Sequence, residues 1–179
     1  MADNGNRPLQ RMVYASMFGA LTAIGAFIVI PVQPVPITLQ TLFTGLASVL
    51  LGGYGGAWSQ IVYILLGIIG LPVFAGGKAG IGTLLGPTGG YLTGFVVAAW
   101  VIGTLVQGRR KPGWPWIVFA LVIGDVIIYT LGTMQLMMVA QISLGKALLV
   151  GVLPFLPGDL VKLAAASLLA LKLRKNFQR

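Results

Sequence analysis

The sequence has 179 residues, of which 57% are hydrophobic and 8% are charged, and its formal net charge is +9. Soluble domains are about 25% charged, so this composition excludes an ordinary soluble fold and predicts an integral membrane protein of one domain, residues 1–179. Cysteine and histidine do not occur, which excludes disulfides and thiolate metal sites and removes the commonest general base and metal ligand. We therefore predict no metal site. The basic residues cluster at the ends of hydrophobic runs rather than in a nucleic-acid-binding patch.

The first hydrophobic run follows a polar N-terminal stretch, residues 1–11, and extends over residues 12–30. It has the length of a membrane span and lacks a signal-peptide cleavage site, so we interpret it as the first transmembrane helix. Ala15, Gly19 and Ala23 lie four residues apart on one face of this helix. Small residues at this spacing allow close approach of another helix, either within the bundle or from a separate membrane subunit, and the sequence leaves both open.

Proline and glycine divide the next part of the chain into shorter segments. Residues 31–36 contain three prolines, which exclude a helix and predict an extended connector. A second span follows over residues 38–51. The glycine-rich residues 52–56 predict a tight turn, and residues 57–71 predict a third span.

Residues 72–90 contain seven glycines among nineteen residues. This composition is too irregular for a lipid-exposed helix and too apolar for an ordinary solvated loop. Because non-helical backbone at membrane depth persists only where protein or a cavity covers it, we predict that this stretch lines or covers a pocket. It lacks the Walker pattern of a phosphate-binding loop.

The rest of the chain predicts three more spans and one short helix. The fifth span carries Asp125 near its middle, and the short segment after it predicts an interfacial helix. The predicted segments are the fourth span, residues 91–106; a basic cluster, 109–111; the fifth span, 116–137; the short segment, 138–153; the sixth span, 158–173; and a basic C-terminus, 173–179.

The positions of the basic clusters predict the orientation in the membrane. With six spans, the N-terminal arginines, the 109–111 cluster and the C-terminal cluster fall on one side. The positive-inside rule makes that side, and both termini, cytoplasmic. The proline-rich connector, the glycine-rich stretch and the start of the last span then meet on the outer side, which predicts an outward-facing ligand pocket capped by the glycine-rich loop.

Asp159 and Lys162 are the main candidates for ligand binding. They lie three residues apart on one helix face, and ionisable residues inside membrane segments are candidates for functional sites. Asp159 lies in the first turn, where the helix dipole favours a carboxylate that accepts hydrogen bonds from ligand N–H groups. Lys162 supplies a cation for a ligand carboxylate or holds Asp159 in place. A purely structural ion pair remains the alternative.

Further candidates surround this pair. Lys78 attracts an anionic ligand if it lies over the pocket, and otherwise is an ordinary exposed lysine. Phe74, Gly77 and Tyr91 are candidates for the pocket lining, which is usually apolar and aromatic. Asp125 and Gln40 are candidates to support the pocket from behind, and Lys162 is a candidate partner for Asp125.

Catalysis is not predicted. The sequence has no histidine or cysteine, no pair of acids close in sequence, and no lysine at a convincing spacing from a serine. Without a Walker motif the chain cannot drive ATP-dependent transport alone. A binding or translocating subunit is therefore the predicted class, rather than an enzyme.

Three stretches together resemble one family. They are PVPITLQ at residues 34–40, LPVFAGG to LGPTGGY at 71–91, and FLPGDLVK at 155–162. The chain resembles the BioY biotin transporter family, the substrate-capturing S components of energy-coupling-factor transporters, over nearly its whole length. The resemblance implies a six-helix bundle in the cell membrane that binds biotin near its outer face without a cofactor. It also implies a transmembrane coupling subunit and two cytoplasmic ATPase subunits as partners.

The resemblance implies roles for individual residues. Asp159 and Lys162 correspond to the family's acid and lysine, which would contact biotin, and Tyr91 matches its tyrosine after Gly-Gly. Lys78 stands where the family often has Asn, and an ammonium group donates hydrogen bonds but does not accept them. Leu92 stands where some members carry an arginine that clamps the carboxylate, so Lys78 is the candidate replacement.

The resemblance also extends to the first span, where Ala15 and Gly19 match the small-residue docking motif of such subunits. Three other readings remain open from the sequence. They are an S component for another vitamin, a membrane-embedded hydrolase with Asp159 or Asp125 as base, and a structural subunit without a small ligand.

Overall fold

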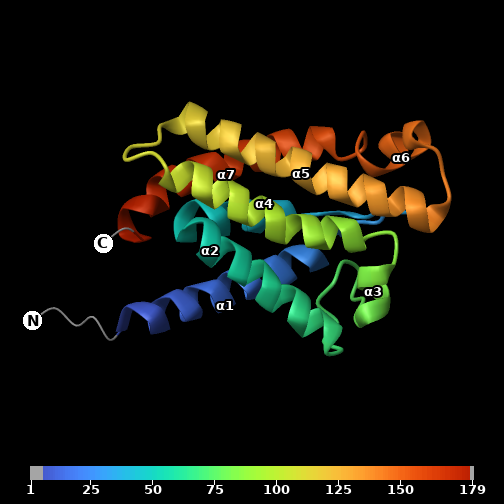
Figure 1. Ribbon diagram of the computed structural model, residues 1–179, viewed down its shortest axis with the longest axis horizontal. Helices are drawn as coiled ribbons and strands as arrows, with labels where there is room; N and C mark the ends of the chain where they lie inside the picture. Colours follow the sequence, from blue (N-terminus) through green and yellow to red (C-terminus); the bar gives the residue numbers. More distant parts are fainter. Residues whose placement is uncertain (1–5, 178–179) are drawn as a thin grey trace, which may run out of the picture.

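The computed structural model describes residues 6–177, so the predicted polar residues 1–11 and basic residues 173–179 are described only in part. This part of the chain is mostly helical, as predicted, with one two-stranded sheet (Figure 1). The elements are α1 (Asn6–Phe27), β1 (Val29–Ile30), β2 (Ile37–Thr38), α2 (Gln40–Ile68), α3 (Ile81–Leu85), α4 (Gly89–Gln107), α5 (Trp114–Ala140), α6 (Leu144–Gly151) and α7 (Leu156–Phe177).

Helix α2 folds back on itself at Gly52. This residue has φ 79° and ψ −176°, a conformation that glycine adopts without steric cost. The Gln40 side chain donates a hydrogen bond to the Tyr63 hydroxyl. In one straight helix these two residues would lie roughly 35 Å apart, so the two halves of α2 must run antiparallel. The predicted second and third spans are thus separate segments, and their turn is confined to Gly52 rather than spread over residues 52–56.

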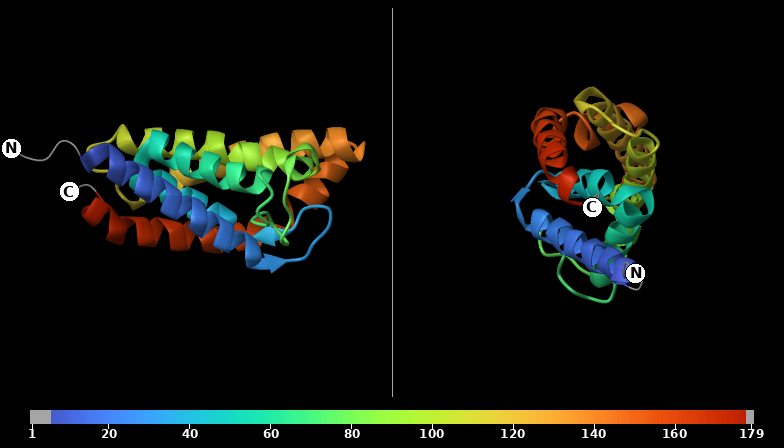
Figure 2. Two further views of the ribbon diagram at one scale, coloured as in Figure 1. Left: turned by 90° about the horizontal axis from the view of Figure 1, so that it is seen from below. Right: turned by 90° about the vertical axis from the view of Figure 1, so that its left-hand side faces the viewer.

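The two halves of α2 form the centre of the bundle. They pack against α1, α4 and α7, whereas α5 packs against α4, α6 and α7 (Figure 2). Glycines allow the closest approach: a Cβ atom on Gly103 of α4 would overlap the backbone of Gly52 and Gly53. Small residues at helix contacts are typical of membrane bundles, because van der Waals packing drives helix association there.

The connectors follow the predictions with small shifts. The proline-rich stretch forms the turn of an antiparallel ribbon in which Val29 pairs with Thr38. The predicted short helix is α6. Helix α7 begins at Leu156, two residues before the predicted start at Gly158, because Pro157 is tolerated in a first helical turn.

One end of the bundle carries the basic cluster of residues 109–111. The first residues of α1, the last residues of α7 and the α4–α5 connection lie at one end, and α3 and α6 lie at the other (Figure 1). The α4–α5 connection carries the basic cluster at residues 109–111. Among residues 6–177, α2, α4 and α5 are long and apolar enough to cross a membrane, and α6 and α7, bent by 53°, make a fourth candidate.

The small residues of α1 face inward. Ala15, Gly19 and Ala23 are buried, and a Cβ atom on Gly19 would lie 2.9 Å from the backbone oxygen of Ser59 in α2. The prediction that these three residues dock a separate subunit is therefore wrong, because α2 already covers the face that they form. Of the two alternatives, packing within the bundle is the observed one.

Candidate functional site

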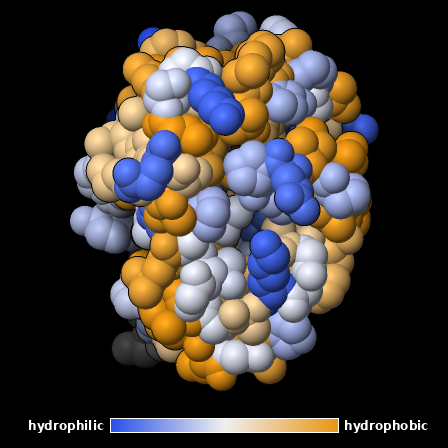
Figure 3. Space-filling model, turned by 90° about the vertical axis from the view of Figure 1, so that its right-hand side faces the viewer, coloured by the Kyte–Doolittle hydropathy of each residue, from blue (hydrophilic) through white to orange (hydrophobic). Residues whose placement is uncertain are grey.

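A cavity opens at the end of the bundle opposite the chain termini. Its empty volume is about 630 Å³, including the part open to solvent. This end of the molecule is hollowed near its centre, with hydrophilic residues beside the hollow (Figure 3). Phe74, Ala75, Lys78, Thr83 and Thr88 all line the cavity, which confirms the prediction that residues 72–90 line a pocket.

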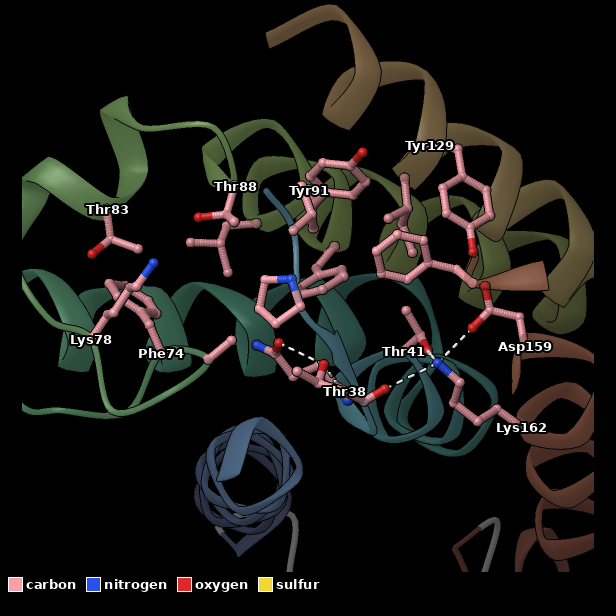
Figure 4. Close-up of a pocket in the computed structure, with 18 residues that line it drawn as sticks. Thr38, Thr41, Phe74, Lys78, Thr83, Thr88, Tyr91, Tyr129, Asp159 and Lys162 are labelled. Atoms are coloured by element: carbon pink, nitrogen blue, oxygen red, sulfur yellow. Dashed lines mark hydrogen bonds and ion pairs between the residues drawn. The ribbon is translucent and has the colours of Figure 1, made fainter. Parts of the chain in front are cut away.

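Lys162 lies at the inner part of this cavity and contacts three oxygen atoms of the chain. Its Nζ is 2.5 Å from Oδ1 of Asp159 and donates to the Thr38 backbone oxygen and the Thr41 hydroxyl, at 3.0 Å each (Figure 4). Two of its contacts are hydrogen bonds and the third is an ion pair. The buried Lys162 therefore ties α7 to the start of α2.

Asp159, in contrast to Lys162, has a side-chain oxygen that makes no hydrogen bond to a described residue. One carboxylate oxygen pairs with Lys162, whereas Oδ2 is buried and has no hydrogen-bond partner in the described chain. The hydroxyl of Tyr129 on α5 is also buried and unpartnered, and it points toward Asp159 (Figure 4). Buried polar groups without partners are unfavourable, and this acceptor and this donor belong to side chains that line the same cavity.

Aromatic rings form the walls of the cavity. The Tyr91 ring stacks on Phe155 with 6.4 Å between centroids, but its hydroxyl donates to the Gly151 backbone oxygen at 2.8 Å and points away from the cavity. Phe74 is 1% exposed and packs edge-on against Tyr63. Both predicted aromatic residues thus line the cavity, and Tyr91 offers it an apolar surface rather than a hydrogen bond.

A tight turn brings Lys78 to the mouth of the cavity. Gly77 has φ 73°, and its N–H donates to the Phe74 backbone oxygen at 2.9 Å. Gly77 does not line the cavity, so its contribution is to the backbone of the turn. Lys78 is exposed and lines the cavity beside Phe74 and Thr83, where it is the one cation other than Lys162 among the lining residues.

Gln40 and Asp125 lie behind this arrangement. Gln40 lines the cavity, but its side chain donates to Tyr63 and accepts from the Thr38 hydroxyl at 2.8 Å. Asp125 does not line the main cavity; it faces a second one, of about 310 Å³ empty volume, that the Asp159 and Lys162 side chains also line. Within the described residues Lys162 pairs with Asp159, not with Asp125.

Sequence reasoning missed several residues of the site, among them Tyr129, Thr38 and Thr41. Tyr129 lies four residues after Asp125 and so shares its helix face, a signal that was present in the sequence. Thr38 and Thr41 hold Lys162 from positions 124 and 121 residues earlier in the chain. Nothing in the local pattern predicts such contacts.

Comparisons with known proteins agree with this architecture. The family model described as the BioY family matches residues 2–179. The chain is 44% identical to the biotin transporter BioY of Thermotoga maritima, over 93% of this chain and 97% of that protein. It is 42% identical to the probable biotin transporter BioY of Lysinibacillus sphaericus, over 93% and 88% of the two chains.

A solved structure gives the same result. A crystal structure of the S-component for biotin from an ECF-type ABC transporter superposes with a TM-score of 0.89 and 29% sequence identity, and the match covers 96% of this chain and 94% of that one. The family model spans nearly the whole sequence, and the fold has a close structural counterpart. The chain therefore belongs to the BioY family.

Proposed function

We propose that this chain captures biotin in the cavity beside Asp159 and Lys162 and serves as the substrate-binding component for biotin uptake. The observation that carries this proposal is the buried Asp159 oxygen, which faces a largely apolar cavity without a hydrogen-bond donor. Biotin offers two ureido N–H donors, an apolar thioether ring and a carboxylate. The names of the relatives support the same ligand.

The positions of Lys162 and Lys78 predict how the ligand is oriented in the cavity. Because Lys162 is buried and already contacts three oxygen atoms of the chain, whereas Lys78 is exposed at the mouth, we expect the carboxylate of biotin to extend toward Lys78. The ureido ring then lies at Asp159. The sulfur-containing ring then contacts the aromatic walls, and sulfur–aromatic contacts are favourable. Hydrogen bonds to charged groups contribute about 1.5–3 kcal/mol each. Two or three of them in an apolar pocket support nanomolar binding, about −12 kcal/mol.

The membrane arrangement belongs to the same proposal. Six crossings arise from α1, the two halves of α2, α4, α5 and α7, as one domain in the cell membrane with the cavity on the outer side. The basic 109–111 cluster at the end shared by α1 and α7 supports cytoplasmic termini. The likeness to the S-component of an ECF-type ABC transporter supports a transmembrane coupling subunit and two cytoplasmic ATPase subunits as partners in uptake.

Calorimetric titration of the purified protein with biotin, thiamine and riboflavin tests the ligand. We expect nanomolar binding of biotin and at least 1,000-fold weaker binding of the other two vitamins, since neither offers a cyclic urea beside a flexible carboxylate. Tighter binding of either one would assign the cavity to that vitamin. Turnover of an amide or ester, lost in an Asp159→Asn variant, would support the hydrolase alternative instead.

Replacing Lys78 tests the proposed orientation. Lys78→Met should weaken biotin binding about fivefold, a modest effect because an exposed ion pair is screened by solvent, and should leave the binding of biotin methyl ester unchanged. Lys146→Met is the matched control, since Lys146 is an exposed lysine of α6 that does not line the cavity. Equal weakening of the acid and the ester would contradict the predicted position of the carboxylate.

A further inference from the structure

Tyr129 has no assigned role, yet its environment resembles that of a ligand-binding group. It lines the main cavity from α5, and its ring packs near Phe155 with 6.2 Å between centroids. Its hydroxyl is buried and makes no hydrogen bond to any described residue. The hydroxyl of a buried tyrosine usually finds a partner, so the cavity is where that partner is expected.

The hydroxyl lies beside a second unpartnered group of complementary type. It points toward Asp159 (Figure 4), whose Oδ2 is buried without a donor. A carboxylate only accepts hydrogen bonds, whereas a tyrosine hydroxyl also donates. A ligand that carries N–H and C=O groups on neighbouring atoms of one edge satisfies both at once, and a cyclic urea has such an edge.

We propose that Tyr129 determines ligand specificity by donating its hydroxyl hydrogen to the carbonyl oxygen of the ligand's cyclic urea, while Asp159 accepts from the adjacent N–H. This inference rests on the proposed function. The Tyr91 hydroxyl, by contrast, donates to the Gly151 backbone oxygen. Among the buried polar side chains that line the main cavity, the Tyr129 hydroxyl is the donor group without a hydrogen bond to a described residue.

The test compares biotin with 2-iminobiotin at neutral pH, where the cyclic guanidine that replaces the urea is protonated and so presents N–H donors and no acceptor at the former carbonyl position. Calorimetry should show that Tyr129→Phe weakens biotin binding about tenfold, as expected for a lost hydrogen bond in a closed site. The same change should alter 2-iminobiotin binding less than threefold. Tyr54→Phe is the control, because Tyr54 is 78% exposed and does not line the cavity; it should change neither affinity.

The thermal midpoint gives a second readout. Since the Tyr129 hydroxyl has no partner within the protein, its removal should leave the midpoint unchanged or raise it slightly. Equal weakening of both ligands together with a lower midpoint would show that Tyr129 only orients Asp159, and would overturn the inference. An unchanged biotin affinity would overturn it as well and leave the proposed function standing. Absence of biotin binding by the unaltered protein would overturn both.

Discussion

Asp159→Asn should weaken biotin binding at least tenfold, measured by calorimetry, while the protein still folds. Asn retains the shape of the side chain, and its amide oxygen can still accept from Lys162. Its NH₂ group then replaces the free oxygen, so that it places a donor against the ureido N–H donors of the ligand. A charged acceptor is lost and a donor–donor contact is created, and a hydrogen bond to a charged group contributes about 1.5–3 kcal/mol.

Asp125→Asn provides the comparison for this prediction. Asp125 is the other carboxylate near the ion pair, but it faces the second cavity and not the main one. We expect its replacement to weaken biotin binding less than threefold. Equal losses in the two variants would mean that negative charge in this region, rather than a contact made by Asp159, supports binding.

Lys162→Met should lower the stability of the protein more than any other single change considered for this site. It removes the cation that Asp159, Thr38 and Thr41 share and leaves a buried carboxylate without its partner. Breaking a buried ion pair in this way costs about 3–5 kcal/mol. For a chain of this size the thermal midpoint should fall by on the order of 10 °C, which a melting curve in detergent without ligand measures.

The double variant Asp159→Asn, Lys162→Met separates charge from packing. When both charges are removed, no unpaired ion remains buried, and the loss of stability should be smaller than in Lys162→Met alone. A double variant as unstable as the single one would show that the contacts of Lys162 with Thr38 and Thr41, not its pairing with Asp159, hold α7 in place.

Local patterns in the sequence predicted the helices and much of the cavity. Hydrophobic runs punctuated by proline and glycine predicted the helical segments, including the reversal at Gly52, because a positive φ leaves a strong signal in residue type. The glycine-rich stretch and the Asp159–Lys162 pair were recognisable because irregular backbone and ionisable groups are both unfavourable in an apolar setting.

The remaining features depend on which face of one helix meets another. The small residues of α1 suit either a neighbour or a partner, and only the packing of Gly19 against α2 decides between them. The sequence likewise could not show that Lys162 donates hydrogen bonds to Thr38 and Thr41, or that the Tyr91 hydroxyl donates to the Gly151 backbone oxygen. These contacts join residues far apart in the chain.

The most direct test of the account is a crystal structure of this protein with bound biotin. The account predicts a ureido N–H within hydrogen-bond distance of Asp159, Lys162 still held by Thr38 and Thr41, and the carboxylate directed toward Lys78. Biotin bound outside the cavity, or inside it with its carboxylate on Lys162 and its ureido ring at the mouth, would contradict the account.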